Sequence, residues 1–543
     1  MKKGWQRFLA CGLMFVLFAS SMLVRPLSAA DELTKLNRDY VDALEIVRNN
    51  YIEPVEYETL NKVAIQTMLH MLDPHSSFYD RKAFDELRSD HSGQYYGIGA
   101  TIGGRDRAVY VLETAKGAPA SRAGLRYGDQ FFEIDGKNVE KLDSKQIQNL
   151  LRGERGTKVT LTVKRLTEAA PVTVTIQRDV VDHPSVSDYF IVRPGVGYIA
   201  LARGFYSTTG DEVSLAIARL KEQGATSMIL DLRNNPGGLV TQAVRVCERF
   251  LQRGQLVVSI RGRSQHYPEQ NLSVNSSTPE TFPLAVLING FSASASEIVA
   301  GAMQDHDRGL LVGENSFGKG LVQTIIPLDA GTGLTLTTQR YYAPSGRLIQ
   351  RDYSNGSFYE YIYKRSLGEA AVTKSRTEEW HTDTGRVVAS GKGIEPDVKV
   401  ESDKVTRGAI EIWNTGLFMF TRDLVAGKVA AAPNFKLGAI EFDHKLKPNE
   451  FVITDEIMNA FRAFMTNFIK ERPEYGLTQA MVDDNLTFER NKIREEVLTA
   501  AYGSAIGQRG GADLDKQLQR AIAELPNAAA LAAQAQRGRR ASR

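Results

Sequence analysis

Residues 289–323 read NGFSASASEIVAGAMQDHDRGLLVGENSFGKGLVQ, and the apolar run LAVLI precedes them at residues 284–288. The run predicts a buried strand that ends at the turn Asn289-Gly290. The Ser/Ala segment and the apolar residues behind it predict a helix of about three turns. A short strand at 310–312 then leads to a glycine-flanked turn that holds Lys319. Serines therefore occupy a strand-to-helix turn, and a lysine occupies a later turn of the same unit.

This arrangement indicates nucleophilic chemistry. The start of a helix offers unpaired backbone N–H groups and the positive end of the helix dipole, which stabilise a developing oxyanion. A serine at such a turn still needs a base. We expect His306 on the far side of the helix, so Lys319 is the better candidate. Lysines act as bases when burial lowers the amine pKa, and a turn packed behind an apolar strand would provide that burial.

The SASASEI segment, followed 25 positions after its middle serine by the lysine of SFGKG and four positions later by Gln323, resembles the C-terminal processing peptidases, or tail-specific proteases. That family consists of serine endopeptidases with a Ser-Lys dyad. The resemblance implies that Ser294 is the nucleophile, Lys319 the general base and Gln323 an orienting amide. It also implies that Asp305 is a supporting acid near the site.

A second match to this family is DLRNNPGG at residues 231–238. Glycines let backbone N–H groups approach a ligand closely. The oxyanion hole is therefore assigned to Gly237 or Gly238, with the backbone N–H of Ala295, and the choice between the two glycines stays open. A phosphate cradle is disfavoured because no GxxxxGK[ST] run is present. Ser296 with Glu297 is expected to cap the helix that follows the nucleophile.

Strands and helices alternate along residues 181–400, the predicted protease core. Apolar runs at 196–201, 228–232, 256–260 and 284–288 predict strands, with helices between them. Such alternation is typical of an α/β core with a mostly parallel sheet and crossover helices. Sites in these sheets lie at the carboxyl ends of strands, where the NNPGG and SASAS turns are expected.

Residues 93–180 resemble an inserted PDZ-like, β-rich domain, through the A-G-L, G-D and I-D-G series at 123–136. Domains of this type bind an extended peptide at a sheet edge and hold its terminal carboxylate in backbone N–H groups. The matching carboxylate loop consists of Gly97, Ile98, Gly99 and Ala100. An empty groove in a rigid spacer is the structural alternative. Arg152 and Arg155 are candidates to link tail binding to the core.

The first thirty residues have the pattern of a signal peptide. A basic start precedes a mostly apolar run over residues 9–24, and small residues precede Asp31. We expect an exported protein, periplasmic or envelope-associated, with tethering by an uncleaved segment as the alternative. The formal charge changes from +3 to −1 without this leader, which holds four basic and no acidic residues. Charge therefore gives no argument for a nucleic-acid partner.

The flanking regions are predicted to be mainly helical. Residues 31–92 form an N-terminal helical region suited to docking or dimerisation, and residues 401–543 form a C-terminal extension without a motif. Helices are expected at 459–469 and 488–502, and the end from Asn527 is expected to fray. Cys247 is expected in the core. The complete fold is thus an α+β multidomain chain.

The sequence therefore predicts an exported serine endopeptidase that recognises protein substrates by their C-terminal tails. No metal or cofactor is implied, since HExxH and Cys/His ligand clusters are missing from the sequence. A homo-oligomer or an adaptor protein remains open as a further partner. A silent tail-binding receptor on a protease fold is the main alternative. A hydrolase with a histidine base is the other, although His183 and His306 lack an obvious acid partner in the sequence.

Overall fold

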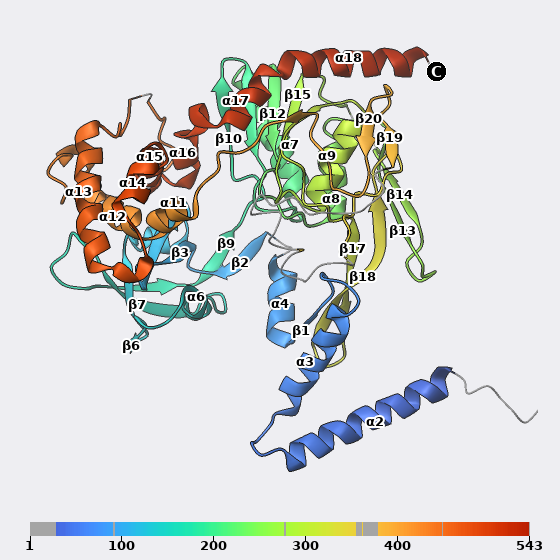
Figure 1. Ribbon diagram of the computed structural model, residues 1–543, viewed down its shortest axis with the longest axis horizontal. Helices are drawn as coiled ribbons and strands as arrows, with labels where there is room; N and C mark the ends of the chain where they lie inside the picture. The colour runs from blue at the N-terminus through green and yellow to red at the C-terminus, as the bar shows by residue number, and fades with distance from the viewer. Residues whose placement is uncertain are drawn as a thin grey trace, which may run out of the picture. The chain divides into compact units, whose positions relative to one another are not determined.

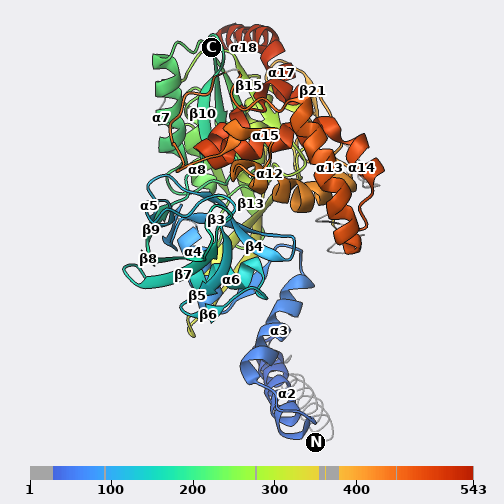
Figure 2. The same ribbon diagram turned by 90° about the vertical axis from the view of Figure 1, so that its left-hand side faces the viewer.

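The computed structural model describes residues 29–90, 93–275, 278–353, 361, 378–447 and 449–541. Their contacts divide the chain into two compact units (Figure 1 and Figure 2). The first unit comprises the described residues up to 81 together with 325–336, and the second comprises those in 82–324 and 337–543. No helix in the described part of the chain has both the length and the apolar content needed to cross a bilayer.

The first unit consists of two helices and a short strand. α2 (Ala29–Asn50) and α3 (Tyr57–His70) lead to a turn held by the Asp73 carboxylate, which accepts hydrogen bonds from the backbone N–H groups of His75 and Ser76. β1 (Ser77–Tyr79) then pairs with residues 333–335. Several apolar side chains of α2 are exposed in this structure: Leu33, Leu36, Tyr40 and Val47.

In the second unit, α4 (Arg81–Asp90) precedes the β-rich domain. The chain enters this domain through β2 (Gln94–Gly97) and leaves through β9 (Asp179–Asp182), and the two strands pair with each other. The sheet between them has the order β3-β4-β5-β7-β8, with β6 paired to β5. β3 is therefore an edge strand within the described residues. The bounds are β3 (Ala100–Arg105), β4 (Ala108–Thr114), β5 (Gln130–Ile134), β6 (Lys137–Asn138), β7 (Lys158–Lys164), β8 (Val172–Gln177), α5 (Pro119–Arg122) and α6 (Ser144–Leu151).

The core sheet has the order β10-β11-β12-β15-β16-β21. All neighbours are parallel except β10 and β11, as the continuous apolar runs indicated. The strands are β10 (Asp188–Arg193), β11 (Val196–Ala200), β12 (Ser227–Asp231), β15 (Leu284–Ile288), β16 (Leu310–Gly313) and β21 (Val398–Lys399).

Helices cover both faces of this sheet. Leu230, Val286 and Ile288 face one core cluster with α7 (Thr209–Glu222), α8 (Val240–Cys247) and α9 (Ala295–Asp305). Alternate residues such as Ile229 and Leu287 face a second cluster with α17 (Lys516–Ala523) and the start of α18 (Leu525–Ala541). The last two helices lie along the sheet in Figure 1. The C-terminal segment thus completes the core.

Shorter strands accompany the core. β13 (Leu256–Gly262) pairs with β14 (Gln270–Ser273) and with residues 339–342 of β18 (Gly333–Tyr342), which also pairs with β17 (Leu321–Pro327). β19 (Glu379–His381) and β20 (Val387–Ala389) form a hairpin. This hairpin lies within the polar segment 352–389. Residues 354–360 and 362–377 of that segment lie outside the described residues.

The C-terminal region has a helical core of its own and contacts the β-rich domain. The Phe418 ring lies 5.1 Å from that of Tyr110 and 5.4 Å from that of Tyr127, and Arg422 Nε donates to the Gly128 carbonyl oxygen. The elements are α11 (Arg407–Ile412), the π-helix η1 (Trp413–Leu417), α12 (Phe418–Val425), η2 (Pro433–Phe435), α13 (Asp455–Glu471), η3 (Pro473–Tyr475), α14 (Gln479–Asp484), α15 (Leu486–Tyr502), α16 (Ser504–Arg509) and η4 (Ala512–Leu514).

Two sequence-based expectations about this region differ in outcome. The helices expected at 459–469 and 488–502 are present, within α13 and α15. The expected fraying from Asn527 is wrong, because α18 runs to Ala541 and buries Ala528 and Ala535. Alanines have high helix propensity, and their small side chains allow the helix to pack closely.

Cys247 is fully buried, and burial raises the pKa of its thiol, as expected of a core residue.

A buried acid in α15 makes the stability of the protein depend on pH. Glu489 is fully buried, and neither carboxyl oxygen has a hydrogen-bond partner within the described residues. Burial, with the nearby Asp483 carboxylate, raises the pKa of Glu489 to about 8. The folded pKa lies above the unfolded value of about 4.3, so the protonated form stabilises the fold at low pH, and this contribution is lost as pH rises through about 8.

We therefore expect Glu489→Gln to melt at a higher temperature than the wild type at alkaline pH. The difference should widen from about pH 5 to about pH 8 and stay constant above that. Thermal melts across this pH range measure the effect, with Glu495→Gln on the same helix as a control. A constant difference at every pH would contradict the prediction.

Candidate active site

Ser294 stands between β15 and α9 in a backbone conformation rare for a residue with a side chain. Its φ is +56° and its ψ is −114°, so the turn is strained and other contacts must hold it. Two neighbouring contacts do so. The Ser292 hydroxyl donates to the Leu232 carbonyl oxygen (2.8 Å), and the Ala293 N–H donates to the Asn235 carbonyl oxygen (2.9 Å). Ser294 is thereby fixed at the positive end of α9.

The buried carboxylate of Glu297 joins the nucleophile turn to the lysine turn. It accepts hydrogen bonds from the backbone N–H groups of Ser294 (2.8 Å), Gly318 (2.7 Å) and Lys319 (2.8 Å), and from the Ser316 hydroxyl. Burial raises the pKa of Glu297, while these four hydrogen bonds act in the opposite direction. A single side chain therefore fixes both predicted dyad residues.

This role differs from the expected cap. Ser294, not Ser296, is the N-cap of α9, and the Ser296 hydroxyl donates to the Asn235 carbonyl oxygen (3.0 Å). The prediction that Ser296 and Glu297 cap the helix together is therefore wrong about Ser296. The Glu297 side chain does reach back to the N-cap N–H, as a capping-box acid does.

Tyr341 on β18 is a site residue that the sequence did not single out. Its hydroxyl donates to the Lys319 carbonyl oxygen and is also hydrogen-bonded to the Ser294 side chain. Burial raises the pKa of Tyr341 well above its usual range, with a further contribution from the Glu297 charge. Tyr341 opens the run YYAPSGR at residues 341–347. No signal in it marks a tyrosine that reaches two distant turns.

Gln323 lies on β17, four residues after Lys319. Its Nε2 donates to Thr337 Oγ1 on β18, at 3.1 Å. This hydrogen bond restrains the side-chain amide. The role of orienting amide stays a prediction.

The NNPGG turn lies directly beside the nucleophile. A Cβ at Gly237 would lie 2.6 Å from the Ser294 Cβ and 2.9 Å from the Ala295 nitrogen. A Cβ at Gly238 would instead lie 2.4 Å from the Phe205 carbonyl oxygen. Both glycines also have positive φ, +96° and +142°. Close approach and backbone conformation therefore both require glycine here.

The N–H groups of the two glycines differ in their partners. Gly237 N–H donates to Asn235 Oδ1 (2.9 Å), while the Gly237 carbonyl oxygen accepts from Phe205 N–H (2.8 Å). The peptide between the glycines is trans, so the Gly238 N–H points away from Phe205. Of the two donors, Gly237 N–H is the one already engaged within the turn.

Asp305 lies at the other end of α9. At a rise of ~1.5 Å per residue, it is roughly 16.5 Å from Ser294 along the helix axis. Its Oδ1 accepts from Arg347 Nη2 (2.8 Å), and its Oδ2 accepts from Ser345 N–H (2.9 Å). The expectation that Asp305 lies near the dyad is therefore corrected, because its carboxylate instead anchors the buried Arg347 and the turn after β18.

The structure also shows where the two histidines considered as alternative bases lie. His306 follows the last residue of α9, with Nε2 2.7 Å from the Leu256 carbonyl oxygen and Nδ1 3.0 Å from Asp383 Oδ2. It does have an acid partner, 77 residues away in the sequence, but at the opposite end of the helix from Ser294. His183 lies in a different cleft, on the β-rich domain.

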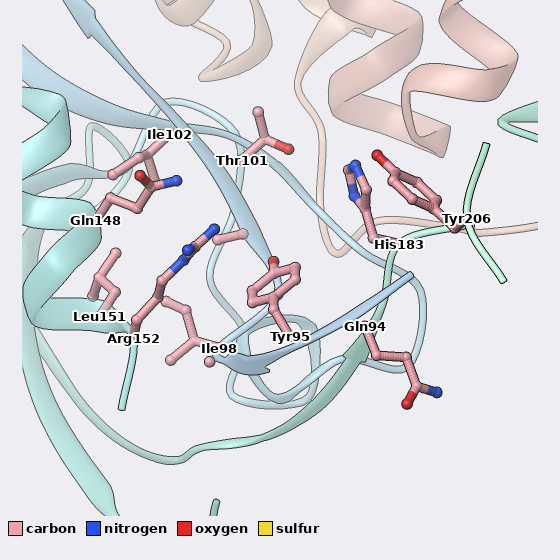
Figure 3. Close-up of a pocket in the computed structure, with 13 residues that line it drawn as sticks. Gln94, Tyr95, Ile98, Thr101, Ile102, Gln148, Leu151, Arg152, His183 and Tyr206 are labelled. Carbon is pink, nitrogen blue, oxygen red and sulfur yellow. The ribbon is translucent and has the colours of Figure 1, made fainter. Parts of the chain in front are cut away.

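That cleft has a volume of about 360 Å³. The four predicted tail-binding residues, Gly97, Ile98, Gly99 and Ala100, all line it, with Ile102 of β3 and Gln148 and Leu151 of α6. Figure 3 shows Gln148 and Leu151 on one side and His183 with Tyr206 on the other. The cleft therefore runs along the edge strand β3, between α6 and residues of the core.

The two arginines singled out in the sequence have different positions. Arg152 lines the cleft, and its guanidinium carbon lies 5.3 Å from the centre of the Tyr95 ring (Figure 3). Arg155 pairs with Asp179 on β9 and is largely exposed. Arg152 therefore brings a cation to the cleft, and Arg155 does not line it.

Comparison with known proteins agrees with this geometry. Residues 195–355 match the model of peptidase family S41, and residues 110–165 match a PDZ domain. The carboxy-terminal-processing protease of Bartonella bacilliformis is 38% identical over 313 residues, which cover 57% of this chain and 71% of that protein. The carboxyl-terminal-processing protease of Synechocystis is 33% identical over 313 residues, 56% of this chain and 72% of that protein.

Among solved structures, the photosystem II D1 C-terminal processing protease is 29% identical, with a TM-score of 0.37 over 68% of this chain and 86% of that one. The sequence match to the Bartonella protein covers more than two thirds of its length. With its S41 core and its PDZ domain, the chain belongs to the carboxy-terminal-processing proteases, serine peptidases of family S41.

Proposed function

We propose that this protease is exported and cleaves protein substrates near their C-termini, recognising them by their C-terminal tails. Ser294 is the nucleophile and Lys319 the general base. The observation that carries this proposal is the shared Glu297 carboxylate, which holds the N–H groups of both residues. Tyr341 supports it, since the tyrosine hydroxyl reaches the Ser294 side chain and the Lys319 carbonyl oxygen.

In the proposed reaction, the unprotonated amine of Lys319 takes the proton of the Ser294 hydroxyl while Oγ attacks the scissile carbonyl carbon. The amide Oε1 of Gln323 is proposed to accept a hydrogen bond from the amine and so to orient it. The lysine then protonates the leaving amine. Water, deprotonated by the same lysine, hydrolyses the acyl-enzyme and regenerates Ser294.

The oxyanion is proposed to bind the backbone N–H groups of Ala295 and Gly238. Ala295 is the first residue of α9, where the helix dipole favours negative charge. Between the glycines, Gly238 is favoured because Gly237 N–H already donates to Asn235 Oδ1. The trans peptide directs the Gly238 N–H away from Phe205, which binds the preceding carbonyl group.

Substrate tails are proposed to bind in the cleft of the PDZ domain. β3 offers an unpaired edge within the described residues, so an extended peptide can add to the sheet. The terminal carboxylate would meet the 97–100 loop and the Arg152 guanidinium, and an apolar last residue would meet Ile98, Ile102 and Leu151. No nucleic-acid partner is proposed.

Export is proposed from the first thirty residues, whose basic start, apolar run and small residues support a signal peptide. The protein would then act in the periplasm or the envelope, or remain tethered by an uncleaved segment. The exposed apolar side chains of α2 support a further contact, with a second copy of the chain or with an adaptor.

We expect both Ser294→Ala and Lys319→Ala to abolish cleavage of an unstructured protein with an apolar C-terminus, because each removes a reacting group. Cleavage is followed on gels with the purified protein, and Lys221→Ala, on the surface of α7, is the control for the lysine substitution. Full activity of Lys319→Ala would refute the assigned base.

Glu297→Gln should lower kcat roughly 10- to 100-fold with the substrate KM little changed. A glutamine presents an NH₂ group where the carboxylate accepts N–H donors, so it cannot hold both turns. Steady-state kinetics measure the effect, and the melting temperature shows whether the fold survives. Unchanged kcat in a folded variant would show that Glu297 does not position the dyad.

Gly99→Ala should weaken tail binding at least 10-fold, since Gly99 has φ +75° and a Cβ there would lie 2.3 Å from the Ala118 Cβ. Fluorescence anisotropy with a labelled tail peptide measures the affinity, in the Ser294→Ala background to prevent cleavage. Gly104→Ala is the matched control, because no atom lies within 4 Å of its added Cβ. Equal affinities for the two variants, or for an amidated peptide and its acid form, would contradict tail binding in this cleft.

A further inference from the structure

The C-terminal extension reaches back to the turn that carries the proposed oxyanion donor. Arg233 stands in this turn, four residues before Gly237, and its side chain is mostly buried. Asp231, at the end of β12, accepts from its Nε (3.0 Å) and Nη2 (2.6 Å). The rest of the guanidinium faces residues almost three hundred positions further along the chain.

Asp515 supplies most of that second contact. Its Oδ2 accepts from Arg233 Nη2 (2.7 Å) and its Oδ1 from Nη1 (3.1 Å), which is a bidentate pair. Gln517 Oε1 accepts a third hydrogen bond from Nη1 (3.0 Å). Burial alone would lower the pKa of Arg233, but the carboxylates of Asp231 and Asp515 raise it. Burial alone would raise the pKa of Asp515, but the Arg233 guanidinium lowers it.

The turn between Arg233 and Gly238 is braced on its other side by the nucleophile turn. Asn234 and Asn289 exchange two hydrogen bonds, Asn234 N–H to Asn289 Oδ1 (3.0 Å) and Asn289 Nδ2 to Asn234 Oδ1 (2.9 Å). The Asn235 carbonyl oxygen accepts from Ala293 and Ser296. Hydrogen bonds therefore hold this turn on one side to the nucleophile turn and on the other side to the C-terminal extension.

We propose that Asp515, with Gln517, is a positioning residue for catalysis: it holds Arg233 and so sets the place of the Gly237-Gly238 peptide beside Ser294. The residue comes from outside the 195–355 segment that matches family S41. The extension therefore contributes to the catalytic step as well as covering the sheet. This inference rests on the proposed roles of Ser294 and Gly238.

Nearby ion pairs do not share these properties. Lys516 pairs with Asp403, but both side chains are more than 60% exposed, and exposed pairs contribute little. Asp513 pairs with Arg193 on β10 and is 73% exposed. Asp515 is 27% exposed and pairs with an arginine that is 16% exposed, so its loss leaves a poorly solvated cation beside the turn with Asp231 as its remaining acid partner within the described residues.

The test compares substitutions that keep the N-cap of α17. Asp515 is that N-cap and accepts from Leu518 N–H (3.0 Å). Asparagine and serine are also good N-caps, so Asp515→Asn and Asp515→Ser remove the charged contact and keep the cap. Asp513→Asn is the matched control, two residues away. kcat and KM are measured on the unstructured protein substrate, together with melting temperatures.

We expect Asp515→Asn and Asp515→Ser to lower kcat about 10-fold, since a displaced oxyanion donor acts on the transition state. KM should change less than about twofold, and Asp515→Glu should recover part of kcat because it restores the charge. Asp513→Asn should match the wild type. Wild-type kcat in both variants would overturn the proposal, as would a loss of kcat that disappears when assays are run well below each melting temperature.

These results are separable from the proposed function. If Ser294→Ala remains active, the assigned nucleophile fails whatever Asp515 does. If Ser294→Ala is inactive and Asp515→Asn keeps wild-type kcat, only the positioning role of Asp515 is refuted.

Discussion

A buried carboxylate that accepts four hydrogen bonds organises this site. Glu297 lies in the first turn of α9 and binds donors from the nucleophile turn and from the lysine turn, which are separated by a helix and a strand. Placing a charge away from water is costly unless several donors compensate it. The donors must therefore stay where they are, and this requirement fixes Ser294 and Lys319 together. Gly237 can then approach Ser294 because no side chain intervenes.

The C-terminal helices cover one face of the core sheet. The strand residues alternate between two clusters, and the second cluster is completed by α17 and α18. Without these helices, the face formed by Ile229, Ala285 and Leu287 would be in water. The C-terminal extension also packs Phe418 against two tyrosines of the PDZ domain. It is therefore structural for the core and for the PDZ domain alike.

Much of this architecture could be predicted from local sequence. Continuous apolar runs identify parallel strands, and the turns after them mark the carboxyl edge of the sheet, so the positions of the SASAS and NNPGG turns follow from the pattern. The choice of Ser294 among the serines of that turn follows from the family resemblance. The PDZ domain and its cleft followed from motifs at fixed spacing. These signals are local, because each depends on residues within one or two elements.

What could not be predicted depends on contacts between distant segments. Tyr341 joins the site only because β18 passes beside the lysine turn, and no periodicity encodes that passage. Asp305 lies at the expected position in the sequence, but its carboxylate pairs with Arg347, 42 residues later. The alanine-rich end of the chain was predicted to fray, because its small side chains give no clear apolar pattern. It instead forms a helix that packs on the sheet.

The pairing of β2 with β9 has a consequence for how the chain folds and evolves. Since the polypeptide enters and leaves the PDZ domain through adjacent, hydrogen-bonded strands, the domain is a module inserted at a single point. Closing a long intervening loop costs only slightly more entropy as its length grows. The insertion can therefore be exchanged, lengthened or retuned for other peptides while the hydrolytic scaffold keeps its own topology.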